Sequence, residues 1–303
     1  MIYTVTLNPS VDYVIHVSQF EENKLNRMKS EAKFPGGKGI NVSRILKRLD
    51  VPTKALGFIG GFTGGFILDE LEKEEVQTDF VTVHGDSRIN IKLKSVKETE
   101  INGEGPLITE EQANELVEKI NNIPNESFLV LAGSIPASLP NSFYKLLTRM
   151  CSNRGVKVAV DASGKVLLDV VQYHPFLIKP NHHELGDLFD ITISSVKEAE
   201  KYGRRLVEMG AVNVIVSMAG EGALLLTEDE SYYANVPKGK VVNSVGAGDS
   251  LVASFLGTYV KTNDVVESFR FGVAAGSATA FSSDLATKEK IEELVSQVTI
   301  QTL

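Results

Sequence analysis

Short, almost entirely apolar stretches alternate with helical segments in the second half of the chain, and this alternation most constrains the fold. The apolar stretches cover residues 128–132, 156–160, 176–178 and 212–216, and helix-like periodicity covers 110–122, 140–153 and 196–210. A strand without polar residues must be covered on both faces, which is typical of parallel sheets in α/β proteins. The sequence therefore predicts a mostly parallel central sheet with helices on both faces.

The first part of the chain adds a smaller β-rich element from two separated stretches, about 10–33 and 86–104. Residues 88–94 alternate strictly between polar and apolar, which predicts a strand with one solvated and one covered face. Asn102-Gly103 indicates a hairpin turn beyond it. Neither stretch is long enough to fold alone. We therefore expect one α/β domain over residues 1–303 that carries a small β-sheet lid.

Polar or glycine-rich residues follow four of the apolar strands. The residues after them are Gly133-Ser134, Asp161, Lys179-Pro180-Asn181 with Glu184, and the stretch Ser217 to Gly222. In an open parallel sheet, ligands bind beyond the carboxyl ends of the strands. Any one strand end carries turn residues as a matter of course, but four together predict a binding site at this rim. Glu184 is suited to holding Mg²⁺ directly or through water.

A run of small residues opens a helix near residue 247. Gly246, Ala247 and Gly248 precede Asp249, and large apolar residues then recur with helical spacing. A helix start has unpaired N–H groups and a partial positive charge, so it suits a phosphate. Asp249 would be repelled by that phosphate, so its presence needs another reason, and a role as general base is one such reason. The alternative is a helix-capping aspartate worth about 1 kcal/mol.

A second glycine-rich loop, Gly36-Gly37-Lys38-Gly39, leads into a helix that carries Asn41. Glycines let a ligand approach the backbone closely, and Asn41 can hydrogen-bond hydroxyl groups. Asp12 and Arg88 of the β-rich stretches suit the hydroxyls and the phosphate of a small anion. Arg27 and Lys38 are further cations there, although any one of these basic residues could instead be a solvated surface charge.

Several other functions are disfavoured. The net charge of −8 argues against sequence-independent nucleic-acid binding. The chain has neither G-x-x-x-x-G-K-[ST] nor G-x-G-x-x-G after a strand, so P-loop and dinucleotide proteins are disfavoured. His182-His183-Glu184 lacks the second histidine of a metalloprotease helix. No basic leader and no apolar run of about 20 residues occurs, so we expect a cytoplasmic protein without a membrane partner.

Two signatures in this order resemble the ribokinase-like, PfkB family of sugar kinases. Residues 36–43 resemble its N-terminal glycine motif, and residues 243–249 resemble its C-terminal anion-hole and catalytic motif. Residues 179–184 resemble its N-x-x-E motif, and the similarity covers essentially the whole chain. Asp50 departs from the family, which usually has Gly or Ser there, but aspartate tolerates the left-handed conformation that a glycine would serve.

The resemblance implies phosphoryl transfer from Mg·ATP to a hydroxyl of a phosphorylated ketohexose. Asp249 would take the hydroxyl proton, and the N–H groups of Gly246, Ala247 and Gly248 would stabilise the transferring group. Glu184, with Asp161, would organise Mg²⁺, and the family leaves room for a monovalent cation such as K⁺. The resemblance assigns ATP to Lys179, Asn181, Ser217, Met218, Ala219, Gly220, Glu221, Gly222 and Gly248. It assigns the sugar to Asp12, Gly37, Asn41, Arg88, Ser134 and Asp249, and its existing phosphate to Arg27 and Lys38.

The β-rich element would act as a lid that excludes water from the sugar. Because an exposed sheet face tends to be buried by a partner, and relatives often pair through their lids, we expect a homodimer through the lid. The alternative from another class is a non-catalytic sugar-phosphate sensor. Loss of Asp249 or of the glycine run would favour it, and both are present.

Overall fold

The computed structural model describes residues 1–303 and contains one large sheet of eleven strands. The strand order is β15-β14-β13-β12-β11-β10-β9-β1-β4-β5, and β6 pairs with β4. The parallel strands are β1 (Ile2–Thr6), β4 (Thr53–Ile59), β5 (Gln77–Thr78), β6 (Val81–Thr82), β9 (Phe128–Ala132), β10 (Lys157–Asp161), β11 (Leu177–Ile178) and β12 (Val214–Ser217). β13 (Ala223–Leu226), β14 (Ser231–Ala234) and β15 (Ile300–Thr302) extend it with antiparallel pairs. The prediction of a mostly parallel sheet is therefore confirmed.

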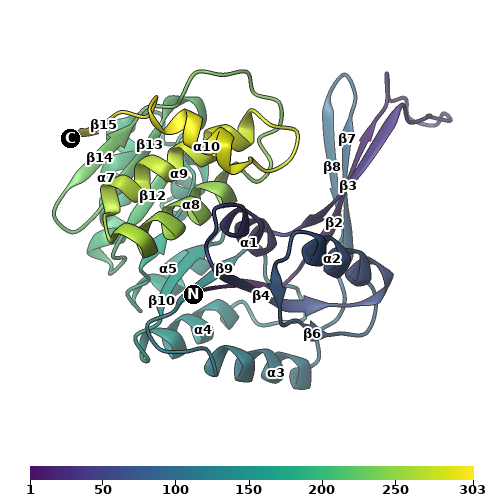
Figure 1. Ribbon diagram of the computed structural model, residues 1–303, viewed down its shortest axis with the longest axis horizontal. Coiled ribbons are helices and arrows are strands. Elements are labelled where there is room, and N and C mark those ends of the chain that lie inside the picture. The colour runs from purple at the N-terminus through teal and green to yellow at the C-terminus, as the bar shows by residue number, and fades with distance from the viewer.

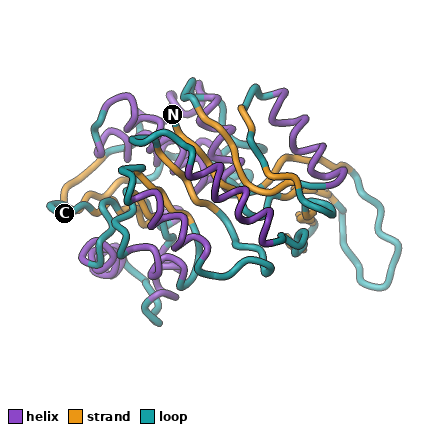
Figure 2. Tube along the Cα trace, turned by 90° about the horizontal axis from the view of Figure 1, so that it is seen from below, coloured by secondary structure: helices purple, strands orange, loops and turns teal.

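Helices cover both faces of this sheet, as Figure 2 shows. One face carries α3 (Glu110–Asn121), α4 (Phe143–Ser152), α5 (Val166–Val171), α6 (His182–Leu188) and α7 (Val196–Glu208). The other carries α1 (Lys38–Arg48), α8 (Ala247–Thr262), α9 (Val265–Ala280) and α10 (Lys288–Val295). In β9, Leu129 and Leu131 pack toward the first layer and Val130 toward the second. This alternation explains why the central strands contain few polar residues. No helix is both long and apolar enough to cross a membrane.

The two β-rich stretches form a separate four-stranded sheet that projects from the body (Figure 1). Its order is β3-β2-β7-β8, from β2 (Ser10–His16), β3 (Ser30–Gly36), β7 (Arg88–Lys94) and β8 (Glu98–Asn102). The helix α2 (Gly61–Lys73) packs beside β2 and β3. The predicted small sheet is confirmed. Because β2 begins four residues after β1 ends, this sheet stands at the carboxyl ends of the parallel strands.

The prediction of a hairpin turn at Asn102-Gly103 is wrong. Asn102 is the last residue of β8 and pairs with Asn90, while the chain reverses earlier, between Lys94 and Glu98. Two cross-strand ion pairs fit this register, Lys92 with Glu100 and Lys94 with Glu98. The turn propensity of Asn-Gly acts over two residues only, and the longer pairing of the strands overrides it.

Candidate active site

A cavity of about 640 Å³ lies where the second sheet meets the rim of the large sheet. Its walls come from the end of β1, from the strands β2 and β7, and from the first turns of α1, α6 and α8. Most residues that the sequence assigned to the site line this cavity. They are Asp12, Gly37, Lys38, Asn41, Arg88, Ser134, Asp161, Lys179, Asn181, Glu184, Ser217, Gly246, Gly248 and Asp249.

Other assigned residues do not line the cavity. Arg27 is exposed in the loop between β2 and β3, so a phosphate contact from it stays a prediction that this cavity does not support. Met218 is buried in the core under β12. Ala219, Gly220 and Glu221 form a short 3₁₀ turn beyond Ser217, followed by Gly222, and Ala247 begins α8. Their contacts with a nucleotide stay predictions.

Sequence reasoning missed several polar residues of the cavity. They are Thr6, Asn8, Ser10, Asn90, Lys92, Asn102 and Ser163. A signal was available for Asn90 and Lys92. They lie at alternate positions after Arg88 along β7 and therefore share its face of the sheet. Three oxygen atoms in this group are buried without a hydrogen-bond partner, namely Thr6 Oγ1, Asn8 Oδ1 and Asn90 Oδ1. Buried polar atoms are normally paired, so these three are exceptions, and Thr6 Oγ1 lies against Gly39 and Asn8 Oδ1 against Gly105 rather than open to the cavity.

The first turns of α1 and α8 face the cavity because glycines precede them. Gly37 has φ 114° and Gly246 has φ 80°, a region that side chains avoid. A Cβ atom at Gly246 would lie 2.5 Å from Leu285 Cδ2, and one at Gly248 would lie 3.1 Å from Lys179 Nζ. The lack of side chains at Gly246 and Gly248 therefore lets Leu285 and Lys179 approach the start of α8. Two helix N-termini at one cavity favour an anionic ligand.

Asp249 lies in the first turn of α8 and is only 5% exposed. Asn41 Nδ2 of α1 donates a hydrogen bond to Asp249 Oδ2 at 2.8 Å. Burial, and then the charge of Asp161, raise the pKa of Asp249 to about 6, against the opposing effects of Lys38, Asn41 and Lys179. A carboxylate whose pKa lies near neutral pH is suited to accept a proton in catalysis.

Asp161, the last residue of β10, anchors two lysines of the cavity. Lys38 Nζ lies 3.0 Å and Lys179 Nζ 3.5 Å from Asp161 Oδ1. Burial alone would raise the pKa of Asp161, but Lys179 and Lys38 together hold it below its usual value. Asp161 therefore stays ionised and keeps both ammonium groups beside Asp249, where they can meet phosphate oxygens.

The second sheet contributes Asp12 and Arg88 to the cavity. Ser10 Oγ and Asn90 Nδ2 donate to Asp12 Oδ1 at 2.8 and 3.1 Å, which leaves the other carboxylate oxygen of Asp12 for a ligand. Arg88 Nε donates to the carbonyl of Asn8 at 3.1 Å and Nη1 to that of Gly103 at 3.3 Å. Arg88 is thus fixed in place with further N–H groups to donate.

Glu184 is placed by a capping box at the start of α6. Asn181 Oδ1 accepts from the Glu184 N–H and Glu184 Oε2 accepts from the Asn181 N–H, both at 2.8 Å. The remaining oxygen Oε1 is available in the cavity. No cluster of three or more metal-ligating side chains occurs in the structure. Magnesium usually takes one or two protein carboxylates beside substrate phosphates and water, and Glu184 fits that pattern better than Asp161, which already pairs with two lysines.

Comparison with known proteins agrees with this geometry. The family model described as pfkB family carbohydrate kinase matches residues 5–292. The 1-phosphofructokinase of Bacillus subtilis is 54% identical over 303 residues, covering 100% of both chains. The D-tagatose-1-phosphate kinase of Bacillus licheniformis is 42% identical over 99% of both chains. The structure of phosphofructokinase-2 from Escherichia coli in complex with substrates and products is 28% identical, with a TM-score of 0.93 and 98% of both chains covered.

The fold and the site are therefore those of a phosphotransferase that acts on carbohydrates. The chain belongs to the pfkB family of carbohydrate kinases.

The raised pKa of Asp249 predicts that Asp249→Asn stabilises the fold at alkaline pH. Because the folded-state pKa lies above the unfolded one, the stability that this group contributes is present below about pH 4 and is lost as pH rises through about 6. Removing the charge should raise the free energy of unfolding at pH 8 by about 1–3 kcal/mol, and by about half as much at pH 5. Thermal unfolding at both pH values measures the difference.

The matched control is Asp50→Asn. Asp50 is exposed, and its backbone is left-handed, a conformation that Asn tolerates. A hydrogen bond from Lys288 lowers the pKa of Asp50. Its replacement should bring no gain at pH 8. Equal unfolding midpoints for wild type and Asp249→Asn at pH 8 would contradict the assigned pKa.

Proposed function

We propose that this protein transfers the γ-phosphoryl group of ATP to fructose 1-phosphate and so forms fructose 1,6-bisphosphate. The observation that carries the proposal is the position of Asp249, hydrogen-bonded to Asn41 between a helix N-terminus and a polar cavity. Asp12, Asn41 and Arg88 line the same cavity, and their polar groups match the hydroxyl and phosphate groups of a sugar phosphate. The choice of fructose 1-phosphate rests on the Bacillus subtilis relative.

In this reaction Asp249 takes the proton of the attacking hydroxyl as the new bond to the γ-phosphorus forms, while the bond from that phosphorus to the β–γ bridging oxygen breaks and ADP leaves. The N–H groups of Gly246, Ala247 and Gly248 donate to the oxygens of the transferring group, where most of the catalysis of this reaction lies. Lys179, which lies against Gly248, adds positive charge beside the same group. The second sheet closes over the sugar and excludes water that would otherwise accept the phosphoryl group.

ATP lies along the rim from Lys179 and Asn181 to the turn after Ser217. Magnesium, when bound, neutralises charge on the phosphates, and Glu184 Oε1 would hold it directly or through water. Asp161 as a second ligand, and a requirement for K⁺, remain proposals that a cation titration of turnover tests. Because the reaction consumes ATP, the cytoplasm is the compartment in which we expect it.

The identity of the sugar is tested by comparing kcat/KM for four substrates. We expect kcat/KM for fructose 1-phosphate to be at least about tenfold higher than for fructose 6-phosphate, tagatose 6-phosphate or D-tagatose 1-phosphate. Tenfold corresponds to ~1.4 kcal/mol in transition-state binding. A preference for either tagatose phosphate would make the chain a tagatose-phosphate kinase, and a preference for fructose 6-phosphate a 6-phosphofructokinase. Tight binding of sugar phosphate without turnover would instead favour a sensor.

The role of Asp249 is tested by turnover and by its pH dependence. Asp249→Asn should lower kcat by roughly 10²–10⁴-fold while ATP affinity changes little, because Asn cannot accept the proton. In wild type, kcat should fall as pH drops through about 6, where Asp249 becomes protonated. Wild-type turnover in Asp249→Asn would contradict the assignment of Asp249 as the general base.

We also propose that the protein is a homodimer through the outer face of the second sheet. On the face away from the cavity, Tyr13, Ile15, Ile89, Ile91 and Ile101 are partly or fully exposed. Strands β2, β7 and β8 place these side chains on one surface, since odd-numbered positions share a face opposite Arg88 and Asn90. An apolar sheet face of this kind is suited to a second copy of itself.

Light scattering at micromolar concentration should give twice the 33.0 kDa mass of the chain. Ile101→Arg should give a monomer, because a charge on the apolar face would be buried in the interface. Leu107→Arg is the control, since Leu107 is 80% exposed and lies outside the second sheet. A monomeric wild type would contradict the proposal.

A further inference from the structure

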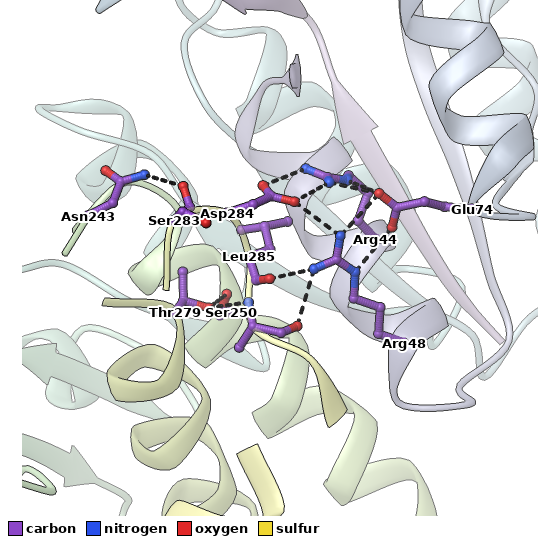
Figure 3. A network of polar contacts seen from close by, with 10 residues as sticks. Arg44, Arg48, Glu74, Asn243, Ser250, Thr279, Ser283, Asp284 and Leu285 are labelled. Carbon is purple, nitrogen blue, oxygen red and sulfur yellow. Dashed lines mark hydrogen bonds and ion pairs between the residues drawn. The ribbon is translucent and has the colours of Figure 1, made fainter. Parts of the chain in front are cut away.

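Two arginines of α1 form a partly buried network with carboxylates from two distant segments (Figure 3). Arg44 is 3% exposed and donates from Nε to Glu74 Oε1 and from Nη2 to Asp284 Oδ2, both at 2.7 Å. Arg48 Nη2 donates to the same carboxylates at 3.1 and 3.2 Å. Two cations and two anions thus compensate one another. Glu74 ends α2, and Asp284 lies in the loop between α9 and α10.

Arg48 also holds the backbone of that loop. Its Nη1 donates to the carbonyl of Leu285 at 2.5 Å and to that of Ala286 at 3.2 Å. Residues 281–286 are therefore tied to α1 through the side chain of Asp284 and through two carbonyl groups. Neither arginine lies within the cavity of about 640 Å³ where the substrates bind.

The other side of residues 281–286 contacts the anion-hole loop. Asn243 Nδ2 donates to the carbonyl of Ser283 at 3.3 Å, and the methyl group of Leu285 occupies the space that a side chain at Gly246 would need. The N–H of Ala286 donates to Thr279 Oγ1 at 3.1 Å, and Thr279 Oγ1 bonds Ser250 Oγ at 2.7 Å. Figure 3 shows the hydrogen bonds that lead from Arg44 and Arg48 to this loop and on to Thr279 and Ser250.

We propose that Arg44 and Arg48 are positioning residues for phosphoryl transfer. They fix residues 281–286, which in turn fix the N–H groups of Gly246 to Gly248 relative to Asp249. The helix α1 then holds both parts of the catalytic machinery: Asn41 holds the base directly, and the arginines hold the anion hole through Asp284 and Leu285. This inference rests on the proposed kinase function, because only a reaction that uses the anion hole would respond to its position.

The chemistry of arginine explains why this residue is required. A guanidinium donates through a rigid planar fork and can serve Glu74 and Asp284 at once, whereas the ammonium of lysine is a single point of charge. Arg44→Lys therefore keeps the charge but loses one of the two ties. Asp284→Asn keeps the shape and removes the charge that both arginines share. Each variant should loosen residues 281–286, and neither replaces a residue that lines the cavity of about 640 Å³.

The first experiment measures kcat and KM for Arg44→Lys and Asp284→Asn. We expect kcat to fall by about 10–100-fold, because displacement of catalytic groups by about 1 Å costs rate on that scale. The KM for fructose 1-phosphate should stay within about threefold, since Asp12, Asn41 and Arg88 keep their places. The double variant should be no slower than the slower single variant, because both changes break one tie.

The second measurement is hydrogen exchange of the backbone amides, followed by mass spectrometry of a peptide that spans residues 243–250. Exchange there should become faster in Arg44→Lys and in Asp284→Asn. Arg204→Lys is the matched control: Arg204 of α7 donates to the Thr227 carbonyl at 2.7 Å and ties down a loop remote from the cavity. It should lower the unfolding temperature without changing kcat or exchange in this peptide.

The outcomes separate the two proposals. Unchanged exchange in residues 243–250 in both network variants overturns the positioning role whatever the substrate is. The role is also overturned by wild-type kcat in both variants, or by a rise in KM with unchanged kcat. If wild type phosphorylates none of the four sugar phosphates, the proposed function fails, and the exchange measurement still decides whether the arginines hold the loop.

Discussion

One hydrogen bond, from Asn41 to Asp249, joins the first turns of two helices whose bonded residues lie 208 positions apart in the sequence. It requires α1 and α8 to begin at the same rim of the sheet. Small residues make this approach possible, since a Cβ atom at Gly39 would lie 2.5 Å from Thr6 Oγ1 and 2.8 Å from the Val5 carbonyl. The glycines at the start of α1 therefore serve its packing against β1 as well as the approach of a ligand.

Burial and neighbouring charges, opposed by this bond, set the protonation state of Asp249. Asn41 favours ionised Asp249, and so do Lys38 and Lys179, yet burial and the neighbouring Asp161 outweigh them. The pKa values of the two carboxylates therefore shift in opposite directions. Asp161 pairs with both lysines, has a lowered pKa and stays charged, whereas the pKa of Asp249 is raised to about 6. Such a division between two nearby acids is typical of a site in which one carboxylate positions charge and the other moves a proton.

The features that the sequence predicted correctly depend on local patterns or on backbone geometry. Apolar strands predicted the parallel sheet, and the left-handed backbone expected at Asp50 is present with φ 57°. The sequence reasoning was wrong or incomplete where the outcome depends on pairing between distant segments. Asn102-Gly103 does not form a turn, because Asn102 pairs with Asn90 across β7 and β8. The pairing of Asp161 with Lys38 was not predicted, because these residues lie 123 positions apart in the sequence. The network around Arg44 had no sequence signal, because its members come from three separate segments, namely α1, the end of α2 and the loop before α10.

The charges of the cavity show why binding of phosphorylated substrates needs both the helix N-termini and the magnesium ion. Its ionisable lining residues are Lys38, Arg88, Lys92 and Lys179 against Asp12, Asp161, Glu184 and Asp249. These charges cancel when all are ionised, so the side chains alone offer no net attraction to two phosphorylated substrates. The remaining positive potential must come from the N–H groups at the starts of α1 and α8, and from the magnesium that the nucleotide brings. Binding of both substrates should thus depend more on backbone geometry at Gly37 and Gly246 than on any single cation.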